Sequence, residues 1–186
     1  MLRSNSYIYL FLIVMVSTFC SPERKSADYY YKNKVEINEL RSNFDYLYQQ
    51  QPFAAGFTDK TFKYYVLQIM TDTVRAIYNN EKYKDEIMKN ILRHNYDTTR
   101  MRTLGNQMKK IKCLWLGRES YYVDEIKDNF LYISFKSADK VFRENKYYIL
   151  VFLDHAIDSN DLERIRKRKL VKIDSLVYFT TTNRYR

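Results

Sequence analysis

The chain contains little glycine, proline or cysteine. Its 186 residues include three glycines, two prolines and two cysteines. So little glycine and proline argues against collagen-like, linker-rich and many-turned all-β architectures. Cys20 and Cys113 alone cannot make a disulfide framework or a site of several metal-bound thiolates. The glycine-rich phosphate loop and the G-x-S-x-G, H-E-x-x-H and C-x-x-C motifs are also missing, so no motif assigns a reaction.

Aromatic and basic residues are abundant instead. Hydrophobic residues make up 46% of the chain and aromatic residues 17%, with 19 tyrosines, which indicates a folded protein. The formal net charge is +10. In a cytosolic protein this charge would favour nucleic-acid binding. An exported chain meets membrane phosphates and other cell-surface polyanions instead, so we expect no nucleic-acid partner.

The first twenty residues have the layout of an export signal. Arg3 precedes Tyr7–Val16, an unbroken apolar run. A membrane-spanning helix needs about 20 apolar residues, whereas a run of this length is typical of the hydrophobic region of a signal peptide. We therefore interpret residues 1–20 as a signal peptide. A buried core segment and an uncleaved anchor are the alternatives.

Cys20 ends this segment, and the polar residues of 21–26 follow it. An apolar run that ends in cysteine before a polar stretch resembles a bacterial lipoprotein signal. The resemblance implies that Cys20 becomes the lipidated first residue of the mature protein and its membrane anchor. Phe19 is bulkier than the residue usual in this family, and Ser17 stands where leucine is common. Ordinary cleavage after Thr18, which would give a soluble secreted protein, is the alternative.

The rest of the chain is predicted to hold a polar tether over residues 21–34 and a single α+β domain over 35–186. This layout is similar to uncharacterised exported lipoproteins of Bacteroidota-type bacteria. The similarity carries no diagnostic motif and implies no activity. It predicts a location in the cell envelope, in the outer membrane or periplasm, with secretion as the alternative.

Helical periodicity dominates the first half of the domain. Apolar residues recur every three or four positions over residues 37–47, 62–77, 83–95 and 98–110, which predicts four helices. The second stretch is also rich in strand-forming residues. Between the first two helices, residues 51–60 are predicted to form a loop with Gly56 as its flexible point. Asp97 or Thr98 is the expected cap of the fourth helix.

Alternating patterns follow Lys110. Strands are predicted at residues 111–115, 130–135 and 146–153, and a hairpin around Asp174 and Ser175. The near-continuous apolar run of 146–153 indicates a central strand covered on both faces. A short helix is expected near 159–167. The sequence thus predicts an α+β fold, with three to four N-terminal helices packed on a mostly antiparallel sheet of four to six strands.

One polar cluster directly follows the expected central strand. Asp154, His155 and Asp158 combine carboxylates with an imidazole. A carboxylate that orients an imidazole raises its pKa and can make an acid/base pair, so these are weak catalytic candidates. The alternative is a loop whose aspartates cap turns while the histidine stays exposed. With two histidines in the chain, we expect no multi-histidine metal site and no cofactor.

A basic run lies near the C-terminus. Its cationic residues are Arg164, Arg166, Lys167, Arg168, Lys169 and Lys172. Such a run attracts anionic lipid headgroups or polymers, by about 1 kcal/mol per residue near a membrane surface. A solvated surface that keeps the protein soluble is the alternative interpretation.

Tyrosines on the expected strands give a further hypothesis. A face lined by Tyr121, Tyr122, Tyr132, Tyr147, Tyr148 and Tyr178 would form a ligand cavity beneath the helices. Ordinary core packing is the alternative.

Three functions remain open. The preferred one is a small non-catalytic cell-envelope lipoprotein that binds or scaffolds an envelope polymer or protein. The others are an envelope ligand-binding domain or hydrolase that uses Asp154, His155 and Asp158, and a secreted effector that binds a partner protein.

Overall fold

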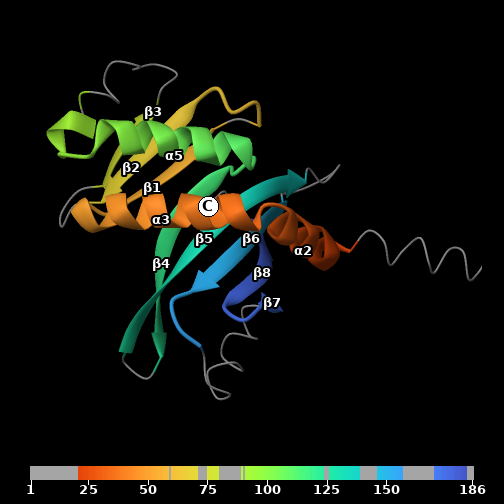
Figure 1. Ribbon diagram of the computed structural model, residues 1–186. Helices are drawn as coiled ribbons and strands as arrows, with labels where there is room; N and C mark the ends of the chain where they lie inside the picture. The colour runs from red at the N-terminus through yellow and green to blue at the C-terminus, as the bar shows by residue number, and fades with distance from the viewer. Residues whose placement is uncertain are drawn as a thin grey trace, which may run out of the picture.

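The computed structural model describes residues 21–58, 60–70, 75–79, 89, 91–123, 126–138, 146–156 and 170–183. These residues form helices packed on one antiparallel sheet (Figure 1). The helices that lie wholly within the described residues are α2 (Pro22–Lys32), α3 (Lys34–Gln50) and α5 (Thr98–Lys110). The strands are β1 (Phe53–Phe57), β2 (Tyr65–Met70), β3 (Arg75–Asn79), β4 (Trp115–Val123), β5 (Ile126–Ala138), β6 (Lys146–Leu153), β7 (Val171–Asp174) and β8 (Val177–Thr182). The predicted α+β class is confirmed.

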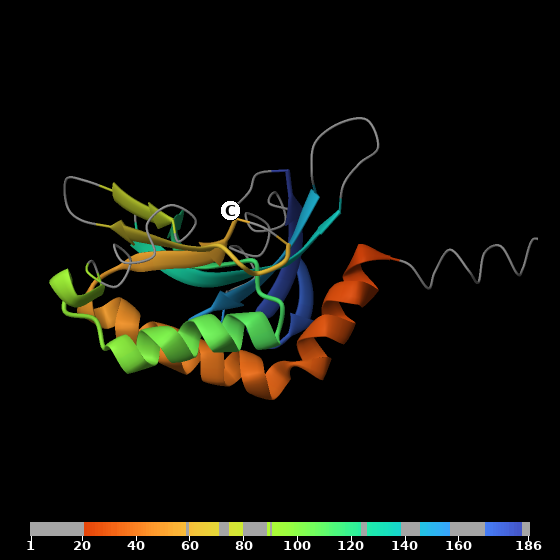
Figure 2. The ribbon, with the colours of Figure 1, turned by 90° about the horizontal axis from the view of Figure 1, so that it is seen from above.

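The sheet has eight strands in the order β3-β2-β1-β4-β5-β6-β8-β7. Every neighbouring pair is antiparallel. Helices α2, α3 and α5 all lie on one face of this sheet, as the view from above shows (Figure 2). The sheet is larger than the predicted four to six strands because β1, β2 and β3 come from segments that the sequence assigned to a loop and a helix.

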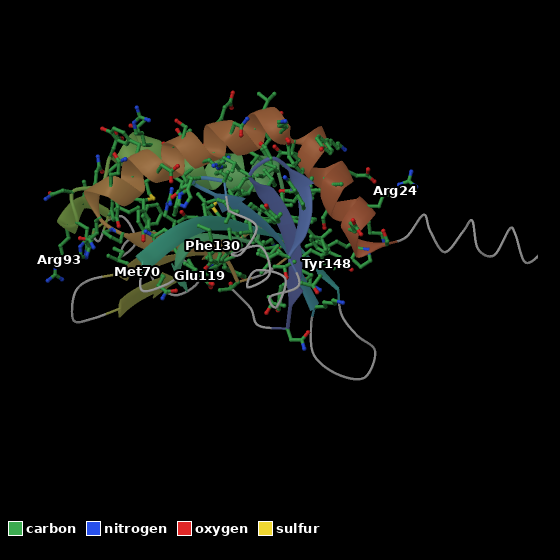
Figure 3. All side chains as sticks on the ribbon, turned by 90° about the horizontal axis from the view of Figure 1, so that it is seen from below. Arg24, Met70, Arg93, Glu119, Phe130 and Tyr148 are labelled. Carbon is green, nitrogen blue, oxygen red and sulfur yellow. The ribbon has the colours of Figure 1, made fainter. Side chains whose placement is uncertain are left out.

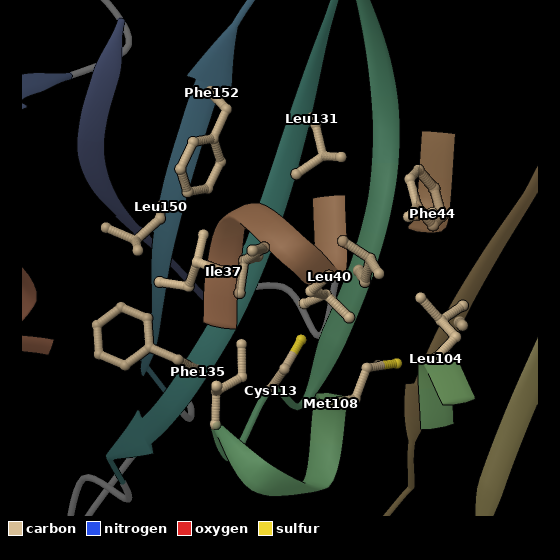
Figure 4. Packing of buried hydrophobic residues seen from close by; sticks show 14 of the residues in the cluster. Ile37, Leu40, Phe44, Leu104, Met108, Cys113, Leu131, Phe135, Leu150 and Phe152 are labelled. Atoms are coloured by element: carbon tan, nitrogen blue, oxygen red, sulfur yellow. The ribbon is translucent and has the colours of Figure 1, made fainter. Parts of the chain in front are cut away.

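Helix α3 is the centre of the covered face. Its fully buried residues, Ile37, Leu40, Phe44 and Leu47, are spaced by three or four positions and therefore share one side of the helix. They pack with residues of the sheet and of α5 in one apolar cluster (Figure 4). The predicted periodicity of 37–47 is confirmed.

Helix α5 also matches its prediction. Asp97 is its N-cap, and the Asp97 carboxylate accepts a hydrogen bond from the backbone N–H of Arg100 at 2.9 Å. Met101, Leu104 and Met108 are buried against the sheet. The α5 helix therefore begins and ends where its cap and its apolar period predict.

Strand β6 is central and covered on both faces. Its residues from Tyr147 to Leu153 are all buried. Leu150 and Phe152 join the cluster beneath the helices, whereas Ile149 and Val151 join a second apolar cluster on the opposite face. The prediction of a doubly covered strand at 146–153 is confirmed.

The predicted helix over residues 62–77 is wrong. Residues 65–70 form β2, which pairs with β1 on one side and β3 on the other. Leu67 and Ile69 face the helices, whereas Val66 lies on the opposite face of the sheet. A run of apolar residues this dense satisfies the helical period as well as the strand period, and its strand-forming side chains favour the sheet.

The predicted loop over residues 51–60 is also wrong in its centre, which forms β1. Gly56 is not a flexible point: a Cβ there would lie 2.0 Å from the Trp115 ring, which packs on the glycine from the paired strand. A Cβ at Gly117 would likewise lie 2.8 Å from the Tyr132 hydroxyl oxygen. The Trp115 indole N–H donates to that hydroxyl at 3.0 Å. Two of the three glycines thus make room for one aromatic pair.

Residues 21–34 were predicted to be a tether, but Pro22–Lys32 forms helix α2. Ser21 caps this helix, since its hydroxyl accepts a hydrogen bond from the Arg24 N–H at 3.2 Å. Pro22 stands in the first turn, where a missing N–H costs nothing. Among the described helices, none is long and apolar enough to span a bilayer. The helix predicted near 159–167 and most of the one predicted at 83–95 lie outside the described residues.

Candidate functional site

An ion-pair network lies where α3, β4 and the end of β6 meet. Arg118 is on β4, opposite Leu131 of β5, whose side chain belongs to the helix-covered cluster. The Arg118 guanidinium donates to Asp45 of α3, from Nη2 at 2.7 Å and from Nε at 3.2 Å. It also donates from Nη1 to Asp154 at 2.8 Å. We call Asp45, Arg118 and Asp154 the ionic centre.

The electrostatics of the ionic centre favour a permanently charged arginine. The Arg118 side chain is 16% exposed, whereas Asp45 and Asp154 are 35% and 42% exposed. Burial alone would lower the pKa of Arg118, but the hydrogen bonds to Asp154 and Asp45 outweigh it and raise that pKa. The network therefore joins one helix and two strands through a single guanidinium.

Arg41 lies beside this network without joining it. Its guanidinium lies over the Phe152 ring, 4.5 Å from the ring centroid. Its Nε is buried and has no hydrogen-bond partner among the described residues. Burial lowers the pKa of Arg41, although the nearby charges of Asp45 and Asp154 act in the opposite direction. Both carboxylates thus pair with Arg118 rather than with Arg41.

In the predicted loop of Asp154, His155 and Asp158, Asp154 joins this network. The Asp154 carboxylate pairs with Arg118, a partner that the sequence did not indicate. His155 follows it and is exposed. Asp158 lies outside the described residues. The structure therefore gives Asp154 an arginine partner that links β6 to α3 and β4.

A second polar cluster fixes the adjoining ends of α2 and α3 to the hairpin of β7 and β8. The Lys34 ammonium and the Asp174 carboxylate are 2.8 Å apart. Asp174 also accepts hydrogen bonds from the Tyr30 hydroxyl at 3.1 Å and from the Ser175 N–H at 2.8 Å. The hydrogen bonds from Lys34, Ser175 and Tyr30 lower the pKa of Asp174 from 3.8 to about 2. The predicted hairpin around Asp174 is confirmed, and Asp174 holds both helices, through Tyr30 of α2 and Lys34 of α3.

The tyrosines of the strands do not line a single face. Tyr148 lies in the helix-covered cluster, whereas Tyr132 and Tyr178 lie in the opposite one. All three are at most 8% exposed. Tyr132 and Tyr178 therefore cannot line a cavity beneath the helices, and the hypothesis of one tyrosine-lined face is wrong for them. The side chains of Tyr121 and Tyr122 lie outside the described part of the chain.

The two cysteines differ in what the structure says of them. Cys113 is fully buried, as predicted, and its Sγ lies 3.3 Å from the Trp115 carbonyl oxygen. Burial raises the pKa of the Cys113 thiol, which keeps it protonated and unreactive. Cys20, the predicted lipid anchor, lies outside the described residues and directly precedes the helix cap Ser21.

The predicted basic run is described at only one position. Lys172 lies on β7 and is exposed, whereas Arg164, Arg166, Lys167, Arg168 and Lys169 lie outside the described residues. Within the described ranges, no three histidine, cysteine, aspartate or glutamate side chains come together as a possible metal site. The anionic-surface hypothesis for residues 164–172 stays a prediction.

No family model matches the chain, and no significant match is found among curated proteins or solved structures.

Sequence reasoning missed the ionic centre because its members are far apart. Arg118 is 73 residues from Asp45 and 36 residues from Asp154. Arg118 interrupts an otherwise strand-like stretch after Gly117, and this was the one available signal. An arginine on the covered side of a strand must find carboxylates or leave an unpaired charge.

Proposed function

We propose that the protein is an exported lipoprotein, held to a membrane through Cys20, whose α+β fold binds another component of the cell envelope without catalysing a reaction. One observation carries the proposal: a positively charged start and a short apolar run end in Cys20. The sequence contains none of the common catalytic motifs sought above. A cell-surface polyanion or an envelope protein is the proposed partner.

The beginning of the fold supports this proposal. Helix α2, the first described element, begins at Pro22, two residues after Cys20. A mature chain that begins at Cys20 contains every residue of the apolar clusters described here.

Fatty-acid labelling of the expressed full-length chain tests the anchor. We expect the native chain to incorporate labelled palmitate, the Cys20→Ser variant to incorporate none, and the Cys113→Ser variant to be labelled like the native chain. The Cys113→Ser control is matched, because it removes the only other cysteine. Labelling that survives Cys20→Ser, or a native chain without label, would contradict the proposal.

A further inference from the structure

Helix α2 begins so soon after Cys20 that almost no chain separates this cysteine from the helix. Ser21 is the helix cap and Pro22 the first helical residue. Two residues of extended chain span at most about 7 Å, so a lipid on Cys20 would hold Pro22 close to the headgroups. Many-residue flexible spacers would let a domain tumble, but this connection is too short for that.

Three consecutive tyrosines fix α2 to the sheet, and we call Tyr29, Tyr30 and Tyr31 the tyrosine cluster. The Tyr29 ring stacks on Phe135 of β5, with centroids 4.0 Å apart. The Tyr29 hydroxyl donates to the Ile111 carbonyl at 2.7 Å. Together with the bond from Tyr30 to Asp174, these contacts set the direction of α2. The direction of α2 in turn sets which end of the molecule lies nearest Cys20.

That end also contains the neighbouring ends of β5 and β6. Arg24 of α2 and Tyr148 of β6 lie at the same end in Figure 3, and Met70 and Arg93 lie at the other. Figure 2 likewise shows the first turn of α2 beside the ends of β5 and β6. Ala138 and Lys146 are paired residues at these strand ends. We call this region, from Ser21 to Lys25 with 136–138 and 146–148, the α2 end.

Basic side chains outnumber acidic ones at the α2 end. Arg24 and Lys136 are exposed, and Lys25 and Lys146 are partly exposed, whereas Glu23 is the one acidic residue among the residues that define it. Lys136 belongs to the side that α2 covers, because its Nζ lies over the Tyr148 ring, 5.6 Å from the centroid. Lysine and arginine close to an anionic leaflet are attracted to its headgroups within about one Debye length.

We infer that the α2 end faces the membrane and contacts anionic lipid headgroups. The inference rests on the proposed anchor, and it adds a fixed orientation that the anchor alone would not give. The opposite end, with Arg93, points away from the bilayer and stays free for an envelope partner. The membrane contact thus belongs to a different group of basic residues from the run over 164–172.

Fluorescence quenching by nitroxide-labelled headgroups tests the orientation in the lipidated full-length protein. A single cysteine carrying a fluorophore is placed at Lys25→Cys, Lys136→Cys or Arg93→Cys. Cys113 is fully buried and does not compete for the label. The vesicles are phosphatidylcholine, with or without phosphatidylglycerol. In phosphatidylglycerol vesicles at low salt, we expect loss of most fluorescence at positions 25 and 136 and little loss at position 93.

The same experiment shows which proposal fails, the lipid anchor at Cys20 or the orientation of the α2 end. Intact mass reports whether Cys20 carries lipid, and an unmodified chain defeats the proposed function itself. A lipidated chain quenched equally at positions 136 and 93 overturns the orientation. Two outcomes would overturn the contact with anionic headgroups. One is quenching at position 136 that is the same in vesicles without phosphatidylglycerol. The other is quenching there that is the same in 1 M salt, where the Debye length falls to about 3 Å and the attraction between charges is screened. Quenching that needs phosphatidylglycerol and falls with salt supports the inference.

Discussion

Helices α2 and α3 lie on the same face of the sheet, but different forces hold them. Helix α3 buries Ile37, Leu40, Phe44 and Leu47 in a continuous apolar stripe. Helix α2 buries only Ser26 and Tyr30, and it depends on hydrogen bonds from its tyrosine hydroxyls. Apolar burial supplies most of the free energy of folding and has no direction, whereas hydrogen bonds add less but fix geometry. Helix α3 therefore stabilises the fold, and α2 sets an orientation.

The largest effect is expected in α3. Phe44 is fully buried and packs on Phe53, with ring centroids 4.9 Å apart. Phe44→Ala should lower the free energy of unfolding by about 3–5 kcal/mol, because it removes apolar contacts and leaves a cavity. Urea denaturation measures this change. Val35→Ala, on the same helix at a residue 67% exposed, is the control and should change it by less than about 0.5 kcal/mol. Equal effects of the two substitutions would show that α3 is not held by its apolar stripe.

The ionic centre should come second. Arg118→Met removes the shared partner and leaves the carboxylates of Asp45 and Asp154 without their donor. We expect a loss of about 1–2 kcal/mol at neutral pH, below that of a fully buried pair because both carboxylates are partly exposed. The double variant Arg118→Met/Asp45→Asn should recover part of this loss. If urea denaturation gave Arg118→Met the same free energy of unfolding as the native protein, the stabilising role assigned to Arg118 would be refuted.

Helix α2 should respond to loss of a single hydroxyl. Tyr29→Phe removes the donor to the Ile111 carbonyl and should cost about 1–2 kcal/mol, because the acceptor loses its partner in a mostly buried position. Tyr31→Phe also removes one hydroxyl, which donates to the Ile173 carbonyl at 3.0 Å, but this tyrosine is 55% exposed. Tyr31→Phe should therefore lower the stability of α2 by less than Tyr29→Phe does, since water can replace the lost hydrogen bond. Hydrogen exchange of the α2 amides measures both, and a larger effect at Tyr31 would reverse the assignment.

The smallest effect is expected at Asp174, and it should depend on pH. The pKa of Asp174 is lowered from 3.8 to about 2 in the folded protein, so folding favours its charged form. Its contribution is therefore present above pH 3.8 and is lost as the pH falls from about 4 toward 2. Asp174→Asn should reduce stability slightly at neutral pH and make unfolding less sensitive to pH across this window. If the free energy of unfolding of that variant fell between about pH 4 and pH 2 as it does in the native protein, Asp174 would be excluded as a source of the pH dependence.

The same contrast explains what the sequence could predict. Helices α3 and α5 and strand β6 follow from apolar period and from the cap at Asp97, and these are local properties. Strand β2 was misassigned because a dense apolar run fits two periods, and only pairing with β1 and β3 decides between them. The sequence predicts a tether in place of helix α2, because the few buried residues of this helix form no apolar stripe. Its contacts with Ile111 and Asp174 are long-range and leave no local pattern.

The candidate sites show the same limit. Asp154 was recognised as a polar residue after a central strand, but its partner Arg118 could not be foreseen from a separation of 36 residues. The prediction for Cys20 needs no distant contact, because it depends on a local pattern in composition. A contact between distant residues depends on how the whole chain packs, and no short stretch of the sequence reveals that packing.

The proposed lipid anchor at Cys20 is tested most directly by the intact mass of the chain purified from membrane fractions of an expressing bacterium. We expect a mature protein that begins at Cys20 and carries acyl chains on that residue. A chain cleaved after Thr18, or an unmodified Cys20, would contradict it.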